Sequence, residues 1–157
     1  MKQMTRTQLV TMAAGGSLAL LLGAFLFQAL GYAPCKMCLW QRWPHAAAIA
    51  LGAAYMGVQT RVLCWLGAGA TAITSALGAY HTGVERKWWQ GPTSCTGGGD
   101  GLLGLTGGDL LPGSAVDAIV MCDAVTWQFL GLSMASYNFI FSAVLMVIWV
   151  IAARKAA

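Results

Sequence analysis

The chain has 157 residues, of which 58% are hydrophobic and only 9% are charged. Soluble domains of this size carry about a quarter charged residues, so the composition indicates an integral membrane protein. The net charge of +4 reflects a shortage of acidic residues rather than a clustered basic face. The composition therefore gives no support to nucleic-acid binding.

The first predicted element is an apolar run from Leu9 to Leu30. It contains no charged residue and is long enough to cross about 30 Å of hydrocarbon. A cleaved secretory signal is the alternative, with Ala29-Leu30-Gly31 as a small-residue site. The run exceeds the usual signal core of about 7–15 residues, however, and further apolar runs follow it, which favours a membrane span.

Three more spans are predicted at about 39–58, 62–82 and 136–153. The span at 62–82, the third in the chain, is rich in small residues that allow close helix packing in lipid. We therefore expect an all-α integral membrane protein, a bundle of four transmembrane helices that forms a single domain over 1–157. Its two extracytoplasmic loops would cover about 31–43 and 84–135.

The charged residues predict how this bundle is oriented. Four spans place both termini on one side, together with the short connector before the third span. That side carries no acidic residue, and all five acids fall in the loop 84–135. By the positive-inside rule, the side with the termini is cytoplasmic. Its basic residues are Lys2, Arg6, Arg61, Arg154 and Lys155.

Four of the five cysteines fall in the predicted outer loops. Cys35 and Cys38 lie in the first loop, and Cys95 and Cys122 lie in the second. The fifth, Cys64, lies at the cytoplasmic end of the third span, and we interpret it as a small buried apolar residue.

Cys35 and Cys38 are spaced so that a helix would place them on one face, with Arg42 one turn beyond Cys38. A helix N-terminus and a neighbouring guanidinium both favour the thiolate form of a cysteine. A c-type haem site would need a histidine where Leu39 stands. A zinc site usually needs two close ligand pairs, whereas the second pair, Cys95 and Cys122, is far apart in the sequence. A redox-active disulfide therefore fits this pair best.

The second cysteine pair and one histidine leave alternatives open. Cys95 and Cys122 could form a static disulfide that closes the second loop, or an exposed disulfide that a partner's thiolate attacks. His81 lies at the outer end of the third span, at a depth similar to that of the CxxC pair. A histidine in this position could be either structural or functional.

Four motifs are spread over about two-thirds of the chain. They are Pro34-Cys35-x-x-Cys38-x-x-Gln41-Arg42-x-Pro44, Tyr80-His81-x-Gly83-Val84-Glu85, Gly91-Pro92-Thr93-Ser94-Cys95, and Cys122-Asp123-x-x-x-Trp127-x-Phe129-Leu130-Gly131-Leu132-Ser133-Met134. As a set they resemble the motifs of the disulfide bond formation protein B family (DsbB/DsbI-like).

This resemblance implies a protein of the bacterial inner membrane with its cysteine loops in the periplasm. Such a protein oxidises a periplasmic thioredoxin-fold dithiol oxidase (DsbA-like) and passes the electrons to a membrane quinone, either ubiquinone or menaquinone. Carried over by position, Cys95 would form the mixed disulfide with the partner, and Cys122 would then exchange with Cys35.

The resemblance also implies a quinone site. Cys38 would face the quinone, Arg42 would hold a quinone oxygen and stabilise the Cys38 thiolate, and His81 would lie near the ring. Two rival functions predict different chemistry. A non-catalytic assembly or transporter subunit would use the outer cysteines as static disulfides, and a metal-binding protein would use them as soft ligands.

Overall fold

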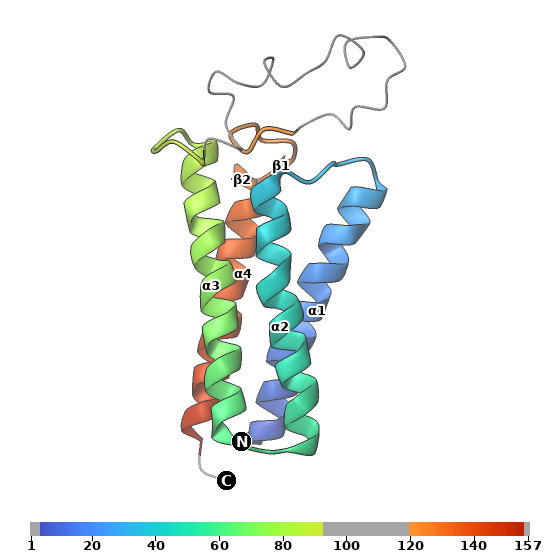
Figure 1. The fold of residues 1–157 in the computed structure, drawn as a ribbon, viewed down its shortest axis with the longest axis vertical. Helices are drawn as coiled ribbons and strands as arrows, with labels where there is room; N and C mark the ends of the chain where they lie inside the picture. Colours follow the sequence, from blue (N-terminus) through green and yellow to red (C-terminus); the bar gives the residue numbers. More distant parts are fainter. Residues whose placement is uncertain (1–3, 93–119, 156–157) are drawn as a thin grey trace.

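The computed structural model describes residues 4–92 and 120–155, and these contain four α-helices that run along a common axis (Figure 1). One helix lies at each of the four predicted spans. Cys95 lies outside the described residues. The helices are α1 (Arg6–Ala29), α2 (Lys36–Gly57), α3 (Arg61–Glu85) and α4 (Met134–Arg154).

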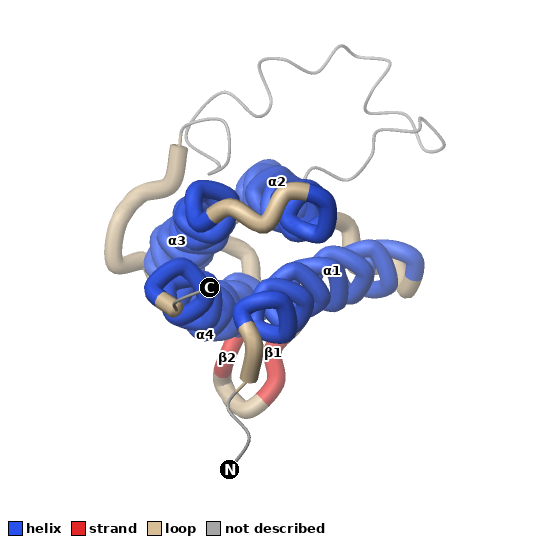
Figure 2. Tube along the Cα trace, turned by 90° about the horizontal axis from the view of Figure 1, so that it is seen from below, coloured by secondary structure: helices blue, strands red, loops and turns tan. Residues whose placement is uncertain are grey.

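The helices follow one another around the bundle in chain order, as the end-on view in Figure 2 shows. α3 packs against both α2 and α4, and α1 closes the bundle by contacting α2 and α4. The start of α1 and the end of α4 lie at the same end, where the Arg6 guanidinium donates a hydrogen bond to the Lys155 carbonyl. The α2–α3 connection lies at this end too.

Three of these helices, α1, α3 and α4, are long and apolar enough to cross a membrane. α2 is not among them. Although it has 22 residues, it carries polar side chains in its first half, among them Gln41 and Arg42. The apolar helices identify a membrane protein, and the polar half of α2 is the part of the bundle that needs a separate explanation.

One short β-hairpin corrects the all-α prediction. Strands β1 (Gln128–Phe129) and β2 (Leu132–Ser133) pair antiparallel just before α4. The turn between them contains Gly131 at a φ of 76°, a left-handed conformation that glycine adopts without steric cost. Two-residue strands are too short to show a periodic pattern, which is why the sequence did not predict them.

The core divides into two clusters of buried residues. The cluster at the end that holds the termini includes Tyr55, Trp149 and Cys64, whose side chain has no exposed surface. This burial confirms the interpretation of Cys64 as a small apolar core residue. The cluster at the opposite end consists of Cys35, Met37, Val84 and Cys122.

Small residues let α3 approach α4 closely. A Cβ atom added at Gly78 would lie 2.9 Å from the Phe139 backbone nitrogen and 3.1 Å from the Ala135 carbonyl oxygen. Because these are backbone atoms of α4, they cannot move aside as a flexible side chain would. The third predicted span is therefore rich in small residues for a packing reason.

We predict that Gly78→Ala destabilises the bundle by about 1–3 kcal/mol, because the added methyl group overlaps the α4 backbone. Gly69→Ala is the matched control on the same helix, since nothing lies within 4 Å of its added Cβ. Thermal unfolding in detergent measures both variants. A Gly78→Ala variant as stable as Gly69→Ala would contradict the close approach of α3 and α4.

Candidate active site

The two cysteines of the CxxC motif meet at the first turn of α2. Cys35 is the N-cap residue, and its sulfur accepts a hydrogen bond from the Cys38 backbone N–H at 3.2 Å. The two sulfur atoms lie 3.0 Å apart, with the Cys35 thiol donating to Cys38. An approach of about 1 Å would bring them to the length of a disulfide bond. Both are free thiols in this structure.

The hydrogen bond between the two thiols favours the protonated form of Cys35. The hydrogen bond to Cys38 and, secondarily, burial raise the pKa of Cys35 to about 12, against a lowering effect of the neighbouring His81. Cys35 therefore keeps its proton at neutral pH, and the sulfur of Cys38 is the acceptor that faces it. This asymmetry makes Cys38 the natural position for a thiolate.

His81 approaches this pair from α3. Its Nε2 lies 3.5 Å from the Cys35 sulfur and 3.9 Å from Glu85 Oε1, and its Nδ1 lies 2.9 Å from Gln41 Nε2. The imidazole is 3% exposed, so these neighbours replace water. The sequence placed His81 at the depth of the CxxC pair, and the structure brings it into contact with Cys35.

A third cysteine lies in the same cluster. Cys122 is 1% exposed and is packed with Cys35, Met37 and Val84, while Cys38 packs against the group from outside. Two cysteines 87 positions apart in the chain are thus buried together at the end of the bundle opposite the termini. The described residues place three of the four predicted site cysteines here.

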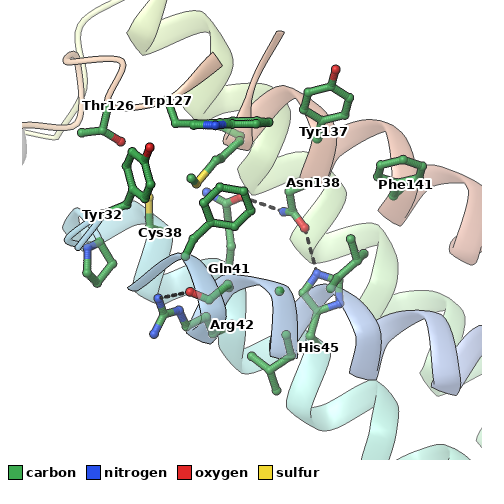
Figure 3. Close-up of a pocket in the computed structure, with 18 of the residues that line it drawn as sticks. Tyr32, Cys38, Gln41, Arg42, His45, Thr126, Trp127, Tyr137, Asn138 and Phe141 are labelled. Carbon is green, nitrogen blue, oxygen red and sulfur yellow. Dashed lines mark hydrogen bonds between the residues drawn. The ribbon is translucent and has the colours of Figure 1, made fainter. Parts of the chain in front are cut away.

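A cavity of about 610 Å³ lies beside the thiol pair, between α1, α2, α4 and the hairpin (Figure 3). Most of its wall is apolar, and a few polar groups lie among the apolar ones, as is typical of sites for small organic ligands. Cys38 lines this cavity, whereas Cys35 and His81 do not. The polar or ionisable side chains in the wall are Cys38, Gln41, Arg42, His45, Tyr32, Tyr137, Asn138, Thr126 and Trp127.

Arg42 is held in the cavity wall by α1. Its guanidinium donates to Gln28 Oε1 at 2.8 Å and to the Ala24 carbonyl at 3.5 Å, and it lies 4.8 Å from the centre of the Phe25 ring. Its Nε is buried and has no partner among the described residues. The arginine thus lines the same cavity as Cys38, while its hydrogen bonds in the described part of the chain go to α1.

A buried polar network, not predicted from the sequence, joins the cavity wall to His81 beside the thiol pair. Asn138 Nδ2 lies 2.6 Å from Gln41 Oε1, and Asn138 Oδ1 lies 2.8 Å from His45 Nε2 (Figure 3). The signal available in the sequence was the presence of Asn138 and His45 inside apolar runs. Polar side chains within membrane helices are costly and usually mark function.

A family model described as disulfide bond formation protein DsbB matches residues 6–152. The chain belongs to the DsbB family. No curated protein and no solved structure matched it in the corresponding searches. DsbB membership agrees with the membrane helices and with the clustered thiols, and it identifies an oxidoreductase of the membrane that acts in disulfide bond formation.

We predict that Cys38→Ala lowers the pKa of Cys35 well below its value of about 12 in this structure, because the largest cause of the raised pKa is the hydrogen bond to Cys38. Cys64, Cys95 and Cys122 are replaced by serine in both proteins, so that Cys35 is followed unambiguously. The pH dependence of alkylation at Cys35, read by mass spectrometry, measures the effect.

Leu39→Ala serves as the control for this experiment. It truncates an exposed side chain on the same helical turn without removing a sulfur. Its alkylation midpoint should match that of the parent protein. A midpoint that also stays unchanged in Cys38→Ala would show that the two thiols do not share a proton.

Proposed function

We propose that this protein is a protein-dithiol:quinone oxidoreductase that reoxidises a periplasmic, DsbA-like thioredoxin-fold oxidase. One observation carries the proposal: the two thiols of the CxxC pair face different surroundings. Cys38 lines the apolar cavity, and Cys35 is buried away from it in a cluster with Cys122. A pair placed in this way can exchange thiols on one side and deliver electrons on the other.

The electron path follows from thiol–disulfide exchange. The partner's dithiol reduces the Cys95–Cys122 disulfide through a mixed disulfide at Cys95, and Cys122 then exchanges with Cys35. Packing of Cys122 with Cys35 supports the second step. Each turnover removes two electrons and two protons from the partner dithiol and leaves a disulfide there.

The cavity fits a quinone head group. Its apolar wall suits the ring and the start of an isoprenoid tail, and its few polar groups suit the ring oxygens. Ubiquinone or menaquinone, when bound, would supply the two-electron acceptor that closes the cycle as quinol. Arg42 would donate to one ring oxygen, and Cys38 would face the ring.

The arrangement of the helices supports a location in the bacterial inner membrane with the thiol site outside. The start of α1, the end of α4 and the α2–α3 connection share one end of the bundle, and the thiol pair lies at the other (Figure 1). The basic residues at the shared end favour a cytoplasmic placement for it. The cysteine loops would then meet the periplasm, where disulfides persist.

We predict that Cys38→Ser abolishes quinone reduction by the dithiothreitol-reduced protein, because no other thiol lines the cavity among the described residues. Anaerobic stopped-flow absorbance of a soluble quinone measures the rate. A Cys38→Ser protein that reduces quinone at the parent rate would contradict the proposal.

We predict that Arg42→Gln weakens quinone use by about tenfold or more in kcat/KM, the loss expected for one hydrogen bond from a charged donor. Arg61→Gln is the control, since Arg61 begins α3 at the opposite end of the bundle. Steady-state kinetics with the same quinone compare the two variants. Equal losses in both would show that Arg42 has no specific role.

A further inference from the structure

Two side-chain amides, Gln41 and Asn138, have orientations that backbone carbonyls determine. Asn138 Nδ2 lies 3.3 Å from the Thr74 carbonyl oxygen, and Gln41 Nε2 lies 3.2 Å from the Met37 carbonyl oxygen. A carbonyl only accepts hydrogen bonds, so the NH₂ group of each amide must face it. The amide oxygens are thereby assigned without reference to either histidine.

The orientation of Gln41 fixes the proton on His81. One N–H of Gln41 is donated to Met37, and its Oε1 accepts from Asn138. The second N–H points to His81 Nδ1 at 2.9 Å, so that nitrogen must accept. A neutral imidazole carries one proton, and here it must lie on Nε2.

This tautomer makes His81 a hydrogen-bond donor to sulfur. Its Nε2–H lies 3.5 Å from the Cys35 sulfur, and the competing acceptors are Glu85 Oε1 at 3.9 Å and the Cys122 backbone carbonyl. Neither nitrogen of the neutral ring then has a free lone pair directed at the thiols. The same assignment argues against a metal site, although ligand atoms of Cys35, Cys38 and His81 lie within 4.8 Å of one another.

We propose that Gln41 is a positioning residue that locks His81 as the donor to the Cys35 sulfur. The inference rests on the proposed function for its role in turnover. When Cys122 and Cys35 exchange, one S–S bond breaks as another forms, and the departing sulfur keeps the electron pair. A donor held at Cys35 stabilises that pair each time Cys35 is the departing sulfur.

Gln41 would act on Cys35 through the histidine. The titratable groups that surround Cys35 are Cys38 from α2, His81 and Glu85 from α3, and Cys122 from the segment before the hairpin. When Cys38 and Cys122 are replaced, His81 and Glu85 are the remaining groups of this set that can shift the pKa of Cys35. The test therefore uses a protein in which Cys35 is the single cysteine.

In this single-cysteine protein, we predict that Gln41→Leu raises the alkylation midpoint of Cys35 by about one pH unit, the loss expected when one hydrogen bond to a thiolate is weakened. Ser142→Ala is the matched control. It removes a buried hydroxyl from the far side of the same network, where Ser142 contacts Asn138 and His45 but not His81. Its midpoint should equal the parent's, and equal midpoints in all three proteins would overturn the proposal.

A second readout holds even if Gln41→Leu does not fold. Nitrogen-15 NMR of histidine-labelled parent protein should show His81 protonated at Nε2, with His81→Asn used to assign its signals. Protonation at Nδ1 would overturn the proposal. Neither readout involves quinone or a partner protein, so a failure of quinone reduction would count against the proposed function and leave this assignment intact.

Discussion

The hydrogen-bonded thiol pair at the first turn of α2 is the contact on which the rest of the site depends. Cys35 ends the extended segment before the helix, and its sulfur caps the Cys38 backbone N–H. Cys38 lines the cavity, and Cys35 lies against Cys122 and His81. In the proposed function, this arrangement separates a side for thiol exchange from a side for electron delivery.

The polar network behind the pair explains why α2 is less apolar than its neighbours. An unpaired side-chain amide in a membrane costs several kcal/mol, so hydrogen bonds among such groups stabilise the bundle. Gln41, Asn138 and Thr74 satisfy one another across three helices, because the Thr74 hydroxyl also donates to the Gln41 carbonyl. The network joins α2, α3 and α4 at the level of the site and orients the histidine beside Cys35.

Sequence patterns predicted the helices and the proximity of the two CxxC cysteines because both depend on local spacing. Cys35 and Cys38 are neighbours on one turn, and long apolar runs form helices in lipid whatever their partners are. The orientation of the Arg42 side chain could not be predicted in this way, because its guanidinium donates to Gln28, which lies 14 positions earlier on α1. The link between Gln41 and His81 spans 40 positions and depends on how α2 packs on α3, which no periodicity encodes.

The central claim is that electrons leave the thiol pair through the cavity, and one measurement tests it most directly. The purified protein is reduced, freed of reductant under anaerobic conditions and mixed with one equivalent of soluble quinone, and its free thiols are then mapped by alkylation and mass spectrometry. The account predicts that a Cys35–Cys38 disulfide forms in step with quinol while Cys64 stays free. Thiols that all remain reduced, with no quinol formed, would contradict it.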